Sequence, residues 1–534
     1  MIEDKPAQKS SVKPRRGGRK SGGRAGRHAK RKKGTAGMAV RPGIEGGAYK
    51  PLSDRDIERI HDTALNVLAN IGIGEPIPEI LEYALPKGCT LDENGRLLFP
   101  RSLVEDLVDV SAKEYVAYAP NPKNDQEIKG QRVHMATSGE AVNILDFATQ
   151  NYRPSTLIDL YDAARLADQL EHIHNFGQPF IATEWSEDVF VHDMNIAYAE
   201  LAGTDKPIAL GIAMVEHIDP LIALFDAYLG KEGGFLERPF CTFGGCPIVS
   251  PLRFGKENAE VLVKVAKLGL TGDIAIAAQA GATAPAALAG ALVQTFASSL
   301  ACLCVMNLIR PGSAINFGIW PFISDLRTGA FSGGSGEEAL VIASATQLAN
   351  HYGLITSVPS GMTDSKTMDA QAGYEKAITT TAVTLAGGNI VSCYPGIVGS
   401  LLAQSFEGMV IDNDMMGSVM RLLRGVEVSD ETLSYDIIES TVHGAGHYLN
   451  QEQTLEIMQT EYLYPEVGDR RTANDWRDGG RETVYELAHA RVKRLLAGHY
   501  PEYITPEADA RIREKFPIKL DPKDMKPGSG RWEG

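Results

Sequence analysis

Acidic and aromatic side chains follow several short apolar runs in this sequence. Glu184 and Trp185 come after one run of strand length, Trp320 ends another, and Tyr394 lies near the end of a third. Aromatic faces beside carboxylates suit a permanent cation such as a quaternary ammonium group, at about 1–2 kcal/mol for each desolvated cation–π contact. The pattern therefore indicates a site for a small onium ligand, although each aromatic residue taken alone is also typical of core packing.

The most polar of these positions lie in GMTDSK, residues 361–366. Asp364 can exchange hydrogen bonds with a ligand and Lys366 can meet a carboxylate, so these two are the predicted catalytic residues. Thr367 or Asp369 would serve as a helix N-cap, which leaves a purely structural interpretation open. The predicted substrate-binding residues share a place at or just after the end of a strand: Glu184, Trp185, Gln279, Phe317, Trp320, Met362, Thr363 and Tyr394.

Eight apolar runs of strand length alternate with helical segments from Leu157 onward. Eight such units over about 270 residues predict an α/β fold, a (β/α)8 TIM barrel, whose site is built after the C-terminal ends of the strands. A doubly wound sheet shows the same alternation, but it normally carries a Gly-rich fingerprint after its first strand, and none follows here. The predicted strands are 172–182, 207–213, 239–245, 273–279, 314–320, 354–360, 389–395 and 425–428.

Accessory segments are expected on both sides of the barrel. Residues 51–155 are typical of helices and short strands, and they open with a helix that Ser53 caps and Gly72 ends. We expect the barrel over 156–445, a helical region over 446–518 and a flexible tail over 519–534. Residues 1–50 form a basic segment with little to bury, which predicts disorder.

Charge is divided unevenly along the 534 residues. Residues 1–36 carry 13 Lys and Arg against two acids, whereas the whole chain has a formal charge of −15. The remainder is therefore strongly acidic, and a nucleic-acid-binding body is unexpected. The basic segment could still attract a polyanion, and the alternative is a solvated tail.

One segment imitates a membrane span, because no charged residue lies between Asp273 and Arg310. Polar residues interrupt it, and a helix buried inside a large α/β protein has the same composition, so no membrane association is expected. No apolar stretch follows the basic cluster as a secretory signal requires. Six scattered Cys suit a reducing cytosol, and the expected location is cytoplasmic.

Signatures of several common enzyme classes are missing. Cys302 and Cys304 do not share a helix face, and His443 and His447 lack a Glu between them, so no metal site is predicted. The sequence contains no G-x-S-x-G elbow and no Gly-rich nucleotide motif in the expected place. An ordinary hydrolase or a nucleotide-dependent enzyme is therefore not indicated.

Four stretches resemble the trimethylamine methyltransferase family, whose members pass methyl groups from methylated amines to a corrinoid protein. They are DLRTGAFSGGSGEEAL (325–340), GMTDSKTMDAQAGYEK (361–376), VIDNDMM (410–416) and GHYLNQEQTLEIMQTEYLYPEVGDR (446–470). The resemblance spans roughly residues 50 to 515 and implies a (β/α)8 barrel. It also implies a corrinoid cofactor carried by a partner protein, since the cobalamin motif D-x-H-x-x-G is absent from this sequence.

The resemblance points to the branch of the family without pyrrolysine. Archaeal trimethylamine enzymes carry that residue in the barrel cavity, near the position of Gly361 or Met362, whereas this chain has only standard residues. The other branch resembles glycine betaine methyltransferases. A quaternary nitrogen leaves as a neutral amine and Co(I) can displace it directly, whereas a tertiary amine must first be activated. Lys366 or Arg327 would pair with a betaine carboxylate.

The resemblance thus implies an amine:corrinoid methyltransferase of the EC 2.1.1 class acting on a quaternary amine such as glycine betaine. Trimethylamine remains an alternative substrate. Other readings are a barrel lyase or hydrolase and a non-catalytic betaine-binding barrel, which would bind ligand without turnover. A homo-oligomer is possible, and fold-level analogy alone would justify none of these functions.

Overall fold

A computed structural model describes residues 38–528 and 530–532 of the chain. The chain divides into two compact units. The larger comprises Val40–Thr432 and Tyr464–Gly534, and the smaller comprises Leu433–Leu463 with the residues up to Ala39. Most of the expected basic segment, residues 1–37, lies outside the described residues.

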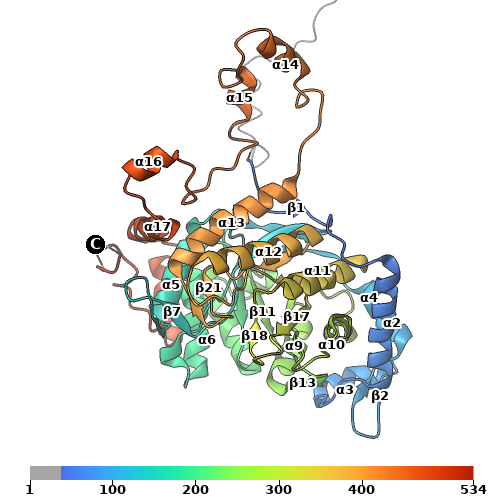
Figure 1. Cartoon of the computed structure of the whole chain (residues 1–534). Coiled ribbons are helices and arrows are strands. Elements are labelled where there is room, and N and C mark those ends of the chain that lie inside the picture. The colour runs from blue at the N-terminus through green and yellow to red at the C-terminus, as the bar shows by residue number, and fades with distance from the viewer. Residues whose placement is uncertain (1–37, 529, 533–534) are drawn as a thin grey trace, which may run out of the picture. The chain divides into compact units, whose positions relative to one another are not determined.

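A curled, mostly parallel sheet organises the larger unit (Figure 1). Among the described residues it contains nine strands, and only β1 (Ile44–Glu45) runs antiparallel to its neighbour. A parallel bridge between Ala136 and Asn175 also brings the segment before β9 beside the end of β6. The order of the parallel strands is β6 (Arg132–Ala136), β20 (Ile390–Ser392), β19 (Thr356–Pro359), β16 (Ile315–Gly318), β14 (Gly272–Ile274), β11 (Cys241–Gly245), β10 (Ile208–Gly211) and β9 (Phe176–Gly177).

Seven of the eight predicted strands are confirmed, because each overlaps one parallel strand of this sheet. The strand predicted at 425–428 is wrong: Gly425 ends helix α13 (Phe406–Arg424), and Val426 is 86% exposed. A strand of a parallel sheet is covered on both faces, which this segment is not. The eighth parallel strand is β6, which lies within the segment expected as an N-terminal accessory region. The proposed domain boundaries stay predictions.

Helices surround the sheet (Figure 1). Helix α2 (Asp54–Asn70) begins and ends where the sequence predicts. The Ser53 side chain accepts from the Asp56 N–H at its start, and Gly72 follows its end with φ +65°. The helices of the larger unit other than α13 are α2 (Asp54–Asn70), α3 (Pro78–Ala84), α4 (Arg101–Val110), α5 (Leu157–Gln169), α6 (Val189–Gly203), α7 (Ile218–Leu229), α8 (Gly234–Glu237), α9 (Lys256–Leu268), α10 (Leu288–Ile309), α11 (Gly336–His351), α12 (Ala370–Ala386), α16 (Ala473–Asp478), α17 (Val484–Gly498) and α18 (Pro506–Lys515).

Helix α10 corresponds to the membrane-like segment of the sequence. Its 22 residues are long and apolar enough to cross a bilayer by length and composition. Most of the helix is buried, and it packs against α2, α4, α9 and strands of the sheet. Burial inside the protein accounts for its composition, as it does for core helices in general.

A hairpin of β4 (Glu114–Ala117) and β5 (Gln126–Lys129) lies across the N-terminal ends of three strands. Gln126 Nε2 donates to the carbonyl of His174 (2.7 Å), before β9. Arg238, before β11, donates through Nη1 to the Ala119 carbonyl (2.6 Å). Between them Asn121 Nδ2 donates to Asp205 Oδ2 (2.7 Å), before β10. The hairpin therefore closes this end of the curled sheet.

Short strands beyond the carboxyl ends of the sheet build its opposite rim. Two small sheets arise there, and further pairs lie elsewhere in the larger unit. The rim sheets are β15 (Ala277–Ala280), β17 (Trp320–Ser324) and β18 (Phe331–Ser332), and β21 (Ile397–Val398), β22 (Ala403–Gln404), β7 (Asn143–Leu145) and β8 (Tyr152–Pro154). The other pairs are β12 (Ile248–Val249) with β13 (Arg253–Phe254), and β2 (Thr90–Leu91) with β3 (Leu97–Leu98).

The smaller unit contains α14 (Tyr435–Val442) and α15 (Glu452–Ile457). Gln451 Nε2 donates to Thr441 Oγ1 (2.7 Å) within it.

At the end of the chain, where a flexible tail is predicted, Leu520 is buried and Trp532 Nε1 donates to Asp162 Oδ2 (2.7 Å).

Candidate functional site

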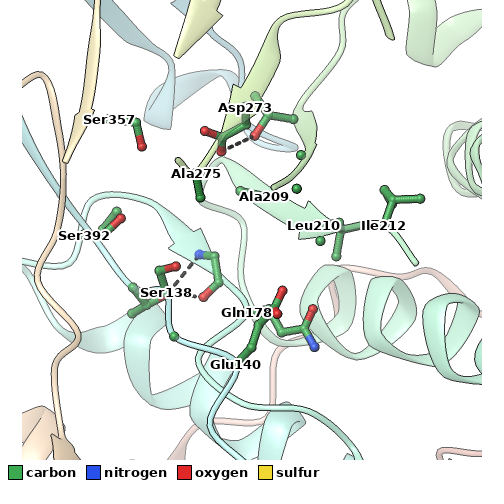
Figure 2. A pocket seen from close by; sticks show the side chains of 18 of the residues that line it. Ser138, Glu140, Gln178, Ala209, Leu210, Ile212, Asp273, Ala275, Ser357 and Ser392 are labelled. Carbon is green, nitrogen blue, oxygen red and sulfur yellow. Dashed lines mark hydrogen bonds between the residues drawn. The ribbon is translucent and has the colours of Figure 1, made fainter. Parts of the chain in front are cut away.

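A cavity of about 580 Å³ lies inside the curled sheet. Its volume falls within the range of about 300–1,000 Å³ that is typical of small-molecule sites. Every parallel strand contributes to its lining, mostly with small side chains, and Figure 2 shows part of this wall. Curled parallel sheets usually fill this interior with bulky branched residues, so the small side chains are what leave it open. Examples from each strand are Ala136, Gly177, Ala209, Gly244, Asp273, Asn316, Ser357 and Ser392.

Glu140 stands on the loop after β6, on the opposite side of the cavity from Asp273 (Figure 2). Its backbone has φ +50°, and its N–H donates to the Gln178 carbonyl (3.3 Å). A Cβ on Gly211 would collide with Glu140 Oε1, so this glycine makes room for the carboxyl group. The surrounding protein raises the pKa of Glu140, and nearby Asp193 adds to the effect. The residue as a whole is exposed, and it lines the cavity.

Asp273 lies at the closed end of the cavity, next to the β4–β5 hairpin. Tyr115 from that hairpin donates through its hydroxyl to Asn316 Oδ1 (2.7 Å), and Thr242 Oγ1 lies 3.4 Å from Asp273 Oδ2. Burial raises the pKa of Asp273 to about 6, while hydrogen bonds from Asn316 and Thr242 oppose the shift. The carboxyl therefore titrates closer to neutral pH than an ordinary Asp does.

Two aromatic side chains line the cavity near the carboxyl ends of the strands. The rings of Trp320 and Tyr394 are perpendicular, with centroids 6.4 Å apart. Trp320 Nε1 donates to the Ser357 carbonyl (2.9 Å), which fixes its ring. Tyr394 has φ +44°, a strained conformation for a bulky residue, and burial raises the pKa of its phenol.

A buried ion pair contacts the backbone at Tyr394. Lys376 of α12 and Asp412 of α13 lie 2.9 Å apart, and their side chains are 1% and 3% exposed. Lys376 Nζ also donates to the carbonyls of Gly361 (2.8 Å) and Tyr394 (3.0 Å). Asp412 Oδ2 accepts from the Gly396 N–H (2.7 Å). The strained turn at Tyr394 is therefore tied to two helices.

Acidic residues dominate the charged side chains of the cavity lining. Its acids are Glu140, Asp193 and Asp273, and no Lys or Arg of the described residues lines it. Asp193 already accepts from the N–H of Ala213 (3.3 Å) and lies 2.7 Å from His217 Nδ1. Carboxylates with aromatic rings and without fixed cations favour a positively charged ligand. Among the described residues, no group of three His, Cys, Asp or Glu is placed to hold a metal ion.

The two predicted catalytic residues do not line this cavity. Asp364 accepts hydrogen bonds from Ser332 Oγ (2.8 Å), the Gly333 N–H (2.7 Å) and Ser400 Oγ (2.5 Å), so it joins three loops. Lys366 is exposed and donates to the Asp364 carbonyl (2.6 Å). Their catalytic roles stay predictions.

Of the eight predicted substrate-binding residues, the structure brings Trp320 and Tyr394 together in the cavity wall. Phe317 packs instead on Phe296 of α10 (5.9 Å between centroids), because side chains of a strand alternate and its neighbour Asn316 faces the cavity. Glu184 accepts from the Leu157 N–H (2.8 Å).

The other four have contacts away from the cavity lining. The Trp185 ring lies 5.4 Å from Lys519 Nζ, and the Gln279 N–H donates to Thr283 Oγ1 (2.9 Å). Thr363 Oγ1 donates to Glu375 Oε2 (2.5 Å), and Met362 is buried. Next to them Asp369 caps α12, as the structural interpretation of this stretch predicted.

Sequence reasoning missed the polar residues that the cavity does contain. Glu140 follows β6, a strand of five residues that includes Arg132 and His134 and therefore looks unlike a buried strand. Asp273 and Asn316 lie within strands, whereas the predicted site residues were chosen at or after the ends of strands. Successive side chains of a strand point to opposite faces of the sheet, so every second residue of each predicted strand was a candidate for the interior. This alternation was the signal that could have identified Asp273 and Asn316.

Comparisons with known proteins agree with the resemblance noted in the sequence. The chain is 29% identical over 465 residues to a glycine betaine methyltransferase of Desulfitobacterium hafniense, covering 87% of this chain and 96% of the relative. It is 28% identical over 461 residues to a trimethylamine methyltransferase of Methanosarcina thermophila, covering 85% and 94%. The crystal structure of the Methanosarcina barkeri monomethylamine methyltransferase matches with a TM-score of 0.46 and 12% identity, over 88% of this chain and 92% of that one. Residues 19–519 match the profile described as trimethylamine methyltransferase (MTTB), and the chain therefore belongs to that family.

Proposed function

We propose that this chain transfers a methyl group from a quaternary amine to the corrinoid of a separate protein. Family membership makes it a methyltransferase. The observation that carries the choice of substrate class is the cavity, in which the rings of Trp320 and Tyr394 are perpendicular and three carboxyl groups line the wall. None of the described Lys and Arg residues lines it. Such a lining stabilises an onium group through its electrostatics and its aromatic faces.

The chain's own residues act by positioning. The rings of Trp320 and Tyr394 hold the methylated nitrogen, and Glu140 balances its charge. The β4–β5 hairpin closes the far end, so ligand and partner approach through the rim, where Val189 and Cys246 are exposed. Reduced cobalt of the partner's corrinoid supplies the nucleophile. Fixing one methyl group toward the rim converts the encounter into an oriented displacement.

The proposed scaffold is a complete (β/α)8 barrel. The parallel bridge between Ala136 and Asn175 supports closure of the eight parallel strands, as does the hydrogen bond from the Thr137 N–H to the Asn175 carbonyl (3.2 Å). In this arrangement β9, the first strand predicted from the sequence, is the second strand of the ring.

The chemistry of the leaving group also favours a quaternary amine. No pyrrolysine is present in this sequence, and a quaternary nitrogen needs no prior activation to leave as a neutral amine. Glycine betaine and trimethylamine are named for relatives and are the first substrates to test. Asp364 enters the proposal as a positioning residue for the loops at 332–333 and 400, and Lys366 as a rim residue. A cytoplasmic location and a homo-oligomer stay predictions.

Methylation of added Co(I) cobalamin, followed by its absorbance, tests the function. The full chain is mixed with trimethylamine, tetramethylammonium, glycine betaine, proline betaine or carnitine. We expect methylation with at least one quaternary amine and a reduction of about tenfold or more in kcat/KM for Trp320→Ala. Trp476→Ala, which changes a Trp outside the cavity lining, is the matched control and should leave kcat/KM unchanged. Binding without methylation would leave only a ligand-binding protein, and no binding of any amine would refute the site.

A further inference from the structure

The cavity is larger than a methylated nitrogen requires. Its volume of about 580 Å³ falls in the range that drug-sized ligands occupy, well beyond the smallest methylated amines. Trp320 and Tyr394 follow the carboxyl ends of their strands, whereas Asp273 lies beside the hairpin at the other end. A ligand that reaches both ends must therefore carry a second group.

The far end offers a charged hydrogen-bond acceptor. We call Tyr115, Thr242, Asp273 and Asn316 the floor of the cavity. The floor partners of Asp273 are neutral, and no Lys or Arg in the described part of the chain forms an ion pair with it. Gly244 lets the chain approach closely here, since a Cβ at that position would collide with the Asp273 carbonyl. An ionised carboxyl in such surroundings gains from a ligand O–H.

A carboxylate on the ligand is poorly matched to this cavity. The cations considered from the sequence for that task, Arg327 and Lys366, lie outside the lining. Arg327 is paired with Asp325, and its side chain is 88% exposed. Inside the cavity a ligand carboxylate would meet the carboxyl groups of Asp273 and Glu140, and no Lys or Arg of the described residues lines it to pair with that carboxylate.

We propose that the floor is a second subsite that takes a hydroxyl group of the substrate, so that the substrate class is a hydroxylated quaternary amine without a carboxylate. This inference rests on the proposed function, because it assumes that the methylated nitrogen lies between Trp320 and Tyr394. The hydroxyl group donates to Asp273.

Calorimetric titration of the full chain with three probes tests the subsite. Tetramethylammonium carries the onium group alone, choline adds a hydroxyl group, and glycine betaine adds a carboxylate. We expect choline to bind at least about tenfold more tightly than tetramethylammonium, as a hydrogen bond to a charged acceptor provides, and glycine betaine to bind more weakly than choline.

Two matched carboxamide variants locate the effect. Asp273→Asn should remove most of the advantage of choline and weaken tetramethylammonium by a much smaller factor. Glu140→Gln should weaken both ligands by a similar factor. The comparison of ligands on the unmodified chain needs no variant, so it stands even if Asp273→Asn does not fold.

The possible failures are distinguishable. Equal affinity for choline and tetramethylammonium, or tighter binding of glycine betaine than of choline, would overturn the floor subsite while leaving the methyltransferase proposal intact. An equal loss for both ligands in Asp273→Asn would overturn the assignment of the hydroxyl group to Asp273. Failure of all three probes to bind would refute the proposed function itself.

Discussion

The ion pair between Lys376 and Asp412 should be worth far more than an ordinary surface pair. Replacing Lys376 by Met leaves Asp412 as a buried carboxylate whose remaining contact is the Gly396 N–H. Breaking one side of a buried pair typically costs about 3–5 kcal/mol, and we expect Lys376→Met to lose that much unfolding free energy. Asp412→Asn should lose less, since Lys376 keeps the carbonyls of Gly361 and Tyr394 as acceptors.

Urea denaturation followed by tryptophan fluorescence measures these losses. The double variant removes both charges of this pair, so its loss of unfolding free energy should fall short of the sum of the single losses by about 1–3 kcal/mol. Lys264→Met is the control, because Lys264 and Asp219 form an exposed pair (2.9 Å) worth at most about 1 kcal/mol. Salt should weaken only the control pair.

The same variants connect stability to the site. Lys376→Met removes the donor that holds the Tyr394 carbonyl, so the strained turn can relax and the aromatic wall shift. KM for a quaternary amine should rise in this variant and remain unchanged in Lys264→Met. Strictly additive losses in the double variant, or a salt response like that of the control, would refute the reasoning.

Four further outcomes are expected. Trp320→Phe should retain more onium affinity than Trp320→Ala, which calorimetry would measure; equal losses would contradict an aromatic role. Because the pKa of Asp273 is raised from 3.8 to about 6, the native chain holds this proton more tightly than the unfolded chain, and stability should fall by up to about 3 kcal/mol between about pH 4 and 7. In Asp273→Asn, urea denaturation at each pH should show no such fall in the free energy of unfolding. If the variant and the unmodified chain lost stability equally over this pH range, the assignment of the fall to Asp273 would be contradicted. Asp364→Asn should cost about 1–3 kcal/mol of unfolding free energy by losing bonds to Ser332, Gly333 and Ser400; unchanged stability with abolished methyl transfer would instead support the catalytic role. Deleting residues 1–36 should leave kcat/KM unchanged, and a large loss would assign that segment a function.

The sheet was largely predictable from the sequence because seven of its parallel strands are apolar runs bounded by turns. The eighth was not, since β6 includes Arg132 and His134 and so does not have the apolar composition of the other strands. Two residues of the cavity lining, Trp320 and Tyr394, were predictable because they follow strands, and their role in substrate binding stays a prediction. The site was not predictable where a residue inside a strand faces inward, as Asp273 and Asn316 do, because a position along the chain does not by itself state which face a side chain takes.

That alternation also explains why a cavity exists at all. In β10 and β11 the cavity lining includes the partly exposed residues Ala209, Gly211, Thr242 and Gly244. Of the residues between them, Leu210 is buried and borders the cavity, whereas Phe243 is buried and lies outside the lining. Phe243, for example, packs against Phe225 of α7, with ring centroids 6.3 Å apart. The outward set holds the helices on the sheet, so its bulk is fixed by stability, whereas the inward set can shrink without loosening that packing. Room for a ligand and space for the Glu140 carboxyl beside Gly211 thus come from the same choice of small inward residues. Of these inward residues, Ala209 and Thr242 are the positions at which a substitution should alter the size of substrate that fits, because Gly211 and Gly244 leave no room for a Cβ.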